Sequence, residues 1–145
     1  MPGRYESFGS IKEGIAGAGV SRVVCLAPLD EILRKSPDYK SAIDQGELPW
    51  LHDPFPVEDY QAPEDREGFL RLARESSARL QSGENILIHC GAGIGKTGTL
   101  AVSVLMALGT AEPLARKNVR NAGSCPERRG QDEVVRWVAE QLRKK

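Results

Sequence analysis

The hydrophobic positions along the chain follow two periods, and these predict an alternation of strands and helices. Short apolar runs predict strands at residues 20–28, 49–57 and 85–89. Several prolines in 49–57 place that strand at a sheet edge. Apolar positions at helical spacing predict helices at residues 10–18, 29–46, 64–82, 100–108, 112–121 and 132–143. Strands alternating with helices predict a three-layer α/β domain, with helices flanking a central sheet that is mixed but mostly parallel.

Local signals refine three of these helices. Ser10 followed by Glu13 has the spacing of a capping box, which predicts that the first helix begins at Ser10. Pro37 must interrupt the helical stretch 29–46, because proline breaks a helix interior. The run 100–108 is apolar nearly all round, so we expect that helix to pack in the centre of the domain.

The stretch 85–99 joins a predicted strand to a predicted helix through a loop with glycines at 91, 93 and 95. Glycines allow backbone N–H groups to converge on one point, and the N-terminus of the following helix adds partial positive charge there. Cys90 stands at the mouth of this predicted anion cradle. The arrangement favours nucleophilic attack by a thiolate on a bound anion.

Two chemistries use such a loop, and the residues distinguish them. A nucleotide-binding P-loop needs glycine, four residues and then Gly-Lys-Ser/Thr. Gly95, Lys96 and Thr97 supply the end of that motif, but its first glycine would fall on Cys90. The alternative is the His-Cys-(five residues)-Arg-Ser/Thr loop, which His89, Cys90 and Thr97 match. A purely structural glycine-rich turn is the third reading.

On these residues the sequence resembles the protein tyrosine phosphatase superfamily, with Lys96 in place of the loop arginine. The order Pro-Gly near the start, Gly19-Val20 before a strand and Pro-Val-Glu-Asp before a helix resembles the compact dual-specificity phosphatases, nearest in layout to the kinase-associated and Cdc14-like branches. The resemblance covers nearly the whole chain and implies the cysteine-dependent phosphatase fold.

The resemblance also implies roles for the loop residues. Cys90 would be the nucleophile, His89 would support its geometry, and Thr97 would donate a hydrogen bond to the sulfur. Backbone amides would hold the phosphate oxygens. The residues concerned are Gly91, Ala92, Gly93, Ile94, Gly95 and Lys96.

Lys96 departs from the family pattern. Lysine keeps the positive charge of arginine but loses its planar, bidentate fork. We expect oxyanion binding to survive and transition-state stabilisation to fall by about 2–3 kcal/mol, by analogy with removal of an oxyanion donor. Arg120 could compensate, although a surface role is the simpler expectation.

The family places its general acid on a loop before the catalytic strand. Asp59, within residues 56–60, fits best, and Asp53 is its rival. Gln131 matches a glutamine that orients the hydrolytic water in relatives, and Cys125 is a candidate resolving thiol, although both could be incidental.

Composition limits the remaining classes. The chain has 145 residues, which predicts one domain over residues 1–145, and 20 basic residues balance 20 acidic ones. The net charge is zero, so the sequence has no excess positive charge to attract nucleic acid or an anionic membrane. No apolar run approaches the ~20 residues of a membrane span. Three cysteines without metal-ligand spacing indicate a reducing, cytoplasmic setting without metal or cofactor.

We therefore predict a monomeric, metal-independent phosphomonoester hydrolase that works through a phosphocysteine intermediate and is slowed by Lys96. Phosphoproteins and small phosphate esters both remain open as substrates. The alternatives are a catalytically weakened phosphate-binding module and, more remotely, a nucleotide-binding P-loop protein, which would need Mg²⁺ and a second acidic site.

Overall fold

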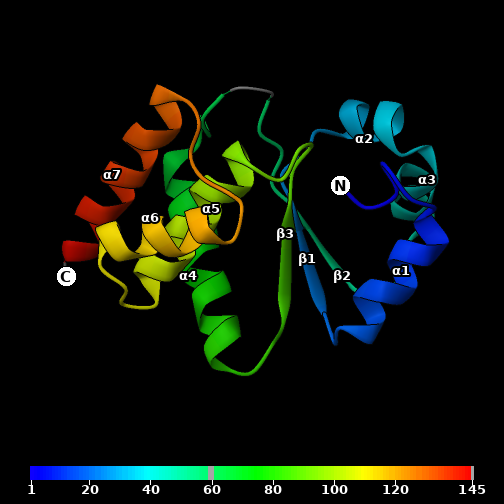
Figure 1. The fold of residues 1–145 in the computed structure, drawn as a ribbon, viewed down its shortest axis with the longest axis horizontal. Coiled ribbons are helices and arrows are strands. Elements are labelled where there is room, and N and C mark those ends of the chain that lie inside the picture. Colours follow the sequence, from blue (N-terminus) through cyan, green and yellow to red (C-terminus); the bar gives the residue numbers. More distant parts are fainter. Residues whose placement is uncertain (59–60, 145) are drawn as a thin grey trace.

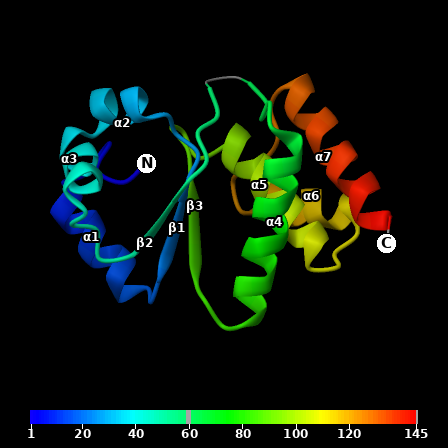
Figure 2. The same cartoon turned by 180° about the vertical axis from the view of Figure 1, so that it is seen from behind.

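The computed structural model describes residues 1–58 and 61–144. Its elements are α1 (Phe8–Gly17), β1 (Arg22–Cys25), α2 (Leu29–Lys35), α3 (Pro37–Gln45), β2 (Leu51–Pro54), α4 (Arg66–Gln81), β3 (Ile86–His89), α5 (Gly95–Ala107), α6 (Glu112–Asn121) and α7 (Arg129–Arg143). The sheet is the middle of three layers, with α1–α3 on one face and α4–α7 on the other (Figure 1). The view from behind shows the same layering (Figure 2). The predicted three-layer α/β fold is confirmed.

The sheet has the strand order β2-β1-β3, and both pairings are parallel. β2 lies at an edge, as its prolines predict. Val24 of β1 is in register with Asp53 on one side and Ile88 on the other. Because the carboxyl ends of parallel strands meet at one edge of a sheet, the segments that follow β2 and β3 leave the sheet together, which is where α/β proteins place their ligand sites.

The central strand β1 contributes to two cores. Val23 and Cys25 face α1–α3 and pack in a cluster with Phe8 and Tyr39. Val24 faces the opposite side, where it joins a larger cluster built mainly from α4, α5 and α7. Side chains of successive strand residues point to opposite faces, so a strand buried on both faces has consecutive apolar residues, here Val23, Val24 and Cys25. Cys25 is 1% exposed and serves as a small buried hydrophobe.

The helix boundaries differ from the predicted ones at four N-termini, one of which is that of α4, which begins at Arg66 rather than residue 64. α1 begins at Phe8, capped by the Ser7 side chain, which accepts from the backbone N–H of Ser10. The prediction that Ser10 is the cap is wrong, because Ser7 provides an equivalent cap one turn earlier. α7 begins at Arg129 rather than residue 132. The predicted break at Pro37 is confirmed, since proline occupies the first turn of α3.

The largest of these differences concerns α5, which begins at Gly95 instead of residue 100. Two glycines in its first turn hide the helix from propensity arguments, since glycine is a poor helix former. Close packing explains one of them: a Cβ on Gly98 would lie 2.5 Å from the backbone of Cys125. No helix in the described residues is long and apolar enough to cross a membrane.

Candidate active site

The thiol of Cys90 lies at the start of the loop between β3 and α5 and is 3% exposed. The Thr97 hydroxyl donates to its Sγ at 3.0 Å, and the Gly93 backbone N–H donates at 3.3 Å. Gly93 has a φ of 78°, a left-handed conformation that glycine adopts without strain. Both donors point at the one sulfur, so they would stabilise negative charge that develops on it during a reaction. The predicted contact between Thr97 and Cys90 is therefore present.

His89 precedes the thiol and is buried beside Tyr39. Its Nδ1 lies 3.3 Å from the Cys90 carbonyl oxygen, and its Nε2 lies 2.8 Å from the Tyr39 hydroxyl. A carbonyl only accepts, so Nδ1 carries the proton and Nε2 accepts from Tyr39. Burial lowers the pKa of His89 to about 3 and raises that of Tyr39. The imidazole is thus neutral, and its low pKa makes it unsuited to act as a base.

A pocket of about 160 Å³ opens above the loop. Its floor contains Cys90 and four of the six residues predicted to hold phosphate. The other two, Gly93 and Ile94, complete the loop; Gly93 donates to the thiol and Ile94 is 36% exposed. Helix α5 begins at Gly95, so its N-terminus and partial positive charge face the pocket. The residues lining the pocket are Arg4, Lys35, Cys90, Gly91, Ala92, Gly95, Lys96, Glu127, Arg128 and Gln131.

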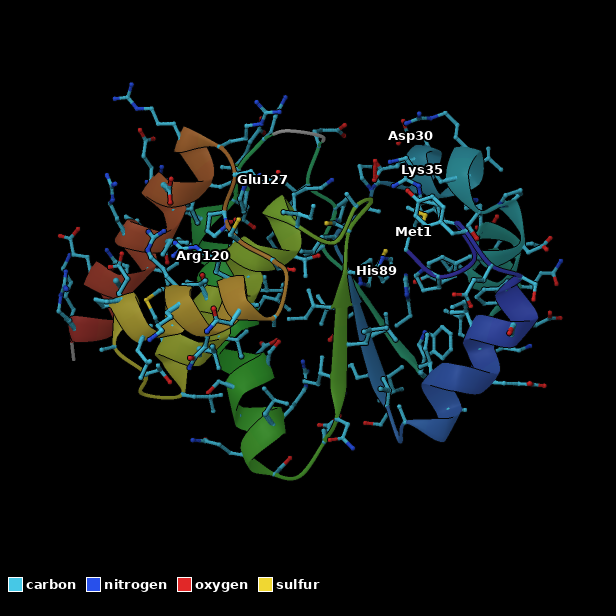
Figure 3. All side chains as sticks on the ribbon, in the orientation of Figure 1. Met1, Asp30, Lys35, His89, Arg120 and Glu127 are labelled. Atoms are coloured by element: carbon cyan, nitrogen blue, oxygen red, sulfur yellow. The ribbon has the colours of Figure 1, made fainter. Side chains whose placement is uncertain are left out.

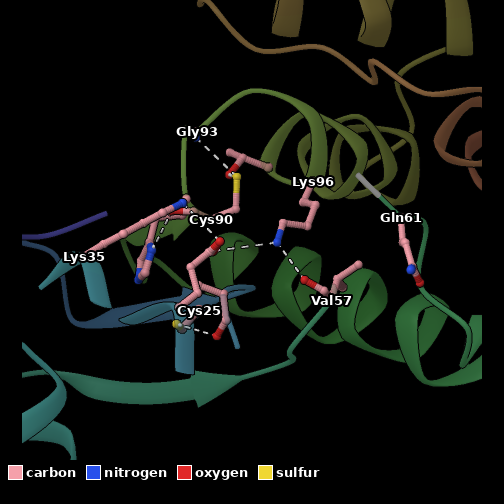
Figure 4. Close-up of polar contacts among 12 residues, drawn as sticks. Cys25, Lys35, Val57, Gln61, Cys90, Gly93 and Lys96 are labelled. Carbon is pink, nitrogen blue, oxygen red and sulfur yellow. Dashed lines mark hydrogen bonds and ion pairs between the residues drawn. The ribbon is translucent and has the colours of Figure 1, made fainter. Parts of the chain in front are cut away.

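Lys96 lines the pocket, but its ammonium has protein partners. Nζ donates to the Val57 carbonyl at 2.6 Å and lies 3.9 Å from the Glu31 carboxylate (Figure 4). The side chain is 7% exposed. Lys96 thus connects the loop to the segment that follows β2.

Gln131 is buried and has contacts on both sides of the pocket. Its Oε1 accepts from the backbone N–H groups of Glu127 and Arg128, and its Nε2 donates to the Gln61 carbonyl. A Cβ on Gly95 would lie 3.0 Å from Oε1. These bonds make Gln131 a bridge between two loops, and they occupy the oxygen that a water-orienting role would use.

The two acid candidates differ in position. Asp59 lies outside the described residues. The Oδ2 of Asp53 forms ion pairs with a guanidinium nitrogen of Arg22 at 3.1 Å and one of Arg79 at 3.2 Å. By register Asp53 lies beside Val24, level with Ile88, but its carboxylate is turned to the guanidinium groups of Arg22 and Arg79. These contacts favour a structural role for Asp53.

The structure adds pocket residues that the sequence did not indicate, namely Arg4, Lys35, Glu127 and Arg128. They come from distant parts of the chain, and no spacing links them to the loop. Arg4 donates to the Gly91 carbonyl at 2.9 Å. Figure 3 shows Lys35 and Glu127 on opposite sides of the loop after β3, and Arg120 away from it on α6. Arg120 therefore does not replace the missing loop arginine.

Comparisons with known proteins agree with this geometry. Residues 8–141 match the family described as Swiss Army Knife protein, DSP-PTPase phosphatase domain. No curated protein matches the chain. Among solved structures, Tk-PTP in its active form is 30% identical, with 90% of this chain and 84% of that chain covered and a TM-score of 0.67.

Two further structures share the fold. Kinase-associated phosphatase, with its catalytic-site cysteine substituted by serine, is 16% identical, with 97% and 80% of the two chains covered and a TM-score of 0.79. Human DUSP28 is 19% identical, with 91% and 85% covered and a TM-score of 0.71. Loop, pocket, fold and family match point the same way: the chain belongs to the Swiss Army Knife DSP-PTPase phosphatase domain family.

Proposed function

We propose that this protein hydrolyses phosphomonoesters without a metal, with Cys90 as the nucleophile. The observation that carries the proposal is the pair of donors, Thr97 hydroxyl and Gly93 amide, that meet on the Cys90 sulfur at the floor of the pocket. Family membership supports a cysteine-based protein phosphatase. The hydrogen bonds from Thr97 and Gly93 support Cys90 Sγ as the reacting atom of this proposal.

In the first step the Cys90 thiolate attacks phosphorus, a sulfur–phosphorus bond forms, and the ester oxygen–phosphorus bond breaks. The departing oxygen takes a proton from Asp59, which we propose as general acid. In the second step water attacks the phosphocysteine, its proton passes to Asp59, and the sulfur leaves as a thiolate. Thr97 stabilises that leaving group, and the loop amides hold the three non-bridging oxygens in both steps.

Lys96 lowers the rate of hydrolysis that we expect. Its ammonium contributes charge near the phosphate but cannot form the two parallel hydrogen bonds of arginine. We propose a slow or specialised enzyme. One observation favours a second candidate function, a module that binds phosphate without hydrolysing it. The Lys96 ammonium already donates to the Val57 carbonyl, and this bond competes with stabilisation of the transition state.

The proposed reaction defines the substrate as a phosphomonoester. A phosphorylated protein or a small phosphate ester fits the proposal. A thiolate nucleophile works best in a reducing compartment, so we propose that the protein acts in the cytoplasm.

The deciding experiment is turnover of para-nitrophenyl phosphate in the presence of EDTA. We expect activity in the unaltered protein and none in Cys90→Ser. Cys125→Ser is the matched control, because Cys125 is a half-buried thiol outside the pocket lining. A requirement for Mg²⁺, or activity that persists in Cys90→Ser, would disprove the mechanism. Tight tungstate binding without turnover would leave the phosphate-binding module.

A further inference from the structure

Glu31 is a buried carboxylate that the mechanism above does not use. It lies in the first turn of α2, and its side chain is 2% exposed. Burial of a charge is costly unless the charge is paired. Its partners therefore indicate why the carboxylate is there.

The two oxygens of Glu31 face two different ammonium groups. Oε2 lies 3.1 Å from Lys35 Nζ, and Oε1 lies 3.9 Å from Lys96 Nζ. Oε1 accepts no hydrogen bond within the part of the chain that the structure describes. A buried carboxylate oxygen with only an ion-pair contact is oriented by charge, and the charge it faces is that of Lys96.

The carboxylate also packs directly against the phosphate loop. A Cβ on Gly91 would lie 2.8 Å from Lys35 Nζ and 3.1 Å from Glu31 Oε1. The loop residue after the nucleophile must therefore lack a side chain for this ion pair to lie where it does. The pair of Glu31 and Lys35 therefore packs against the loop at Gly91.

The Lys96 ammonium contacts both the Glu31 carboxylate and the segment after β2. Its Nζ lies 3.9 Å from Glu31 Oε1 and donates to the Val57 carbonyl at 2.6 Å (Figure 4). Val57 is two residues from Asp59, the proposed acid. A primary ammonium is compact and can turn its three donors to both groups, whereas a guanidinium is larger and presents its donors in a rigid planar fork. The surroundings of Lys96 fit lysine.

We propose that Glu31 is a positioning residue for Lys96: it directs the ammonium to the Val57 carbonyl and so holds Val57, two residues before the proposed acid Asp59. This inference rests on the proposed phosphatase function. Lys96 then serves mainly proton delivery to the leaving group and only secondarily phosphate binding. It follows that the site is built around lysine and does not contain a degraded arginine.

The test uses Glu31→Gln, which keeps the shape of the side chain and removes its charge. Asp30→Asn is the matched control, because Asp30 is an exposed carboxylate in the same helical turn (Figure 3). We expect Glu31→Gln to lower kcat on an alkyl phosphate about 5- to 10-fold more than on para-nitrophenyl phosphate, since only the poor leaving group needs the acid. Tungstate affinity, measured by calorimetry, should stay the same or rise, because Lys96 loses its competing carboxylate.

Two further variants make the outcome decisive. In a Lys96→Met background, Glu31→Gln should have no further effect on leaving-group dependence. If that effect persists, Glu31 acts independently of Lys96 and the inference is wrong. Lys96→Arg should leave kcat/KM unchanged or lower it, and a tenfold rise would contradict a site built around lysine.

Tungstate affinity distinguishes failure of this inference from failure of the proposed function. Parallel loss of tungstate affinity and of turnover on both esters in Glu31→Gln would show a merely structural role and overturn the inference. The calorimetric comparison needs no turnover, so it tests Glu31 even in a protein that only binds phosphate.

Discussion

The hydrogen bond from Thr97 to Cys90 gives the sharpest prediction about the reaction. Thr97→Val replaces the hydroxyl with a methyl group of nearly the same size. It removes the 3.0 Å bond to Sγ and leaves the Gly93 amide as the remaining donor. We expect the step in which sulfur departs as a thiolate to suffer most, because that step develops negative charge on the atom that Thr97 contacts.

The magnitude follows from the strength of a hydrogen bond to a charged group, about 1.5–3 kcal/mol. At about 1.4 kcal/mol for each factor of ten, hydrolysis of the phosphocysteine should slow by about 10- to 150-fold. Formation of the intermediate should slow less. The phosphoenzyme should therefore accumulate during turnover in the variant.

Rapid mixing with para-nitrophenyl phosphate measures this directly. We expect a burst of para-nitrophenol in Thr97→Val, followed by a slower steady state. The control is Thr99→Val, which removes another hydroxyl from the same helix; that hydroxyl bonds to the Gly95 carbonyl at 2.7 Å and not to the thiol. Equal slowing of both steps, or the same kinetics in the two variants, would refute the reasoning.

Three other predictions concern the support of the thiol and the acid. Tyr39→Phe removes the 2.8 Å bond to buried His89 and should cost about 1–3 kcal/mol in the free energy of unfolding, measured with urea; an unchanged value would contradict it. Because the pKa of His89 is lowered from 6.5 to about 3, the unfolded state binds a proton that the folded state does not, so stability falls as pH drops through this range. The free energy of unfolding should fall by at most about 1.4 kcal/mol for each pH unit. Urea unfolding of His89→Asn between about pH 5 and 6 should show a weaker dependence on pH. The same dependence as in the unaltered protein would disprove burial of a neutral His89. Asp59→Asn should lower kcat most on alkyl phosphates, whereas Asp53→Asn should reduce stability through its lost ion pairs and leave that leaving-group dependence unchanged; the reverse result would exchange the two roles.

Much of the fold could be predicted from the sequence, because burial leaves a regular pattern. The β-branched run around Val24 identified the central strand, and Pro37 identified the break between α2 and α3. α6 has the predicted bounds. Helix starts were less accurate: the first turn of α5 contains glycines that only the packing against Cys125 explains.

The part of the site formed by consecutive residues could be predicted from the sequence. The part formed by residues from distant segments, which meet only in the folded protein, could not. The loop motif located Cys90 and its contact with Thr97. Nothing in the sequence placed Arg4 or Lys35 at the pocket, because they belong to segments distant from the loop. Glu31 looked like an ordinary acidic residue in the first turn of a helix. Its burial depends on the loop that packs over α2, which no local pattern records.

The central claim is that Cys90 carries the phosphoryl group between the two steps. The most direct measurement is rapid-quench mass spectrometry of the protein during turnover of para-nitrophenyl phosphate with EDTA present. The mechanism predicts one transient phosphoryl group on the peptide containing Cys90, enriched in Thr97→Val and absent from Cys90→Ser. Turnover with no such intermediate in Thr97→Val, or a phosphoryl group on another residue, would contradict it.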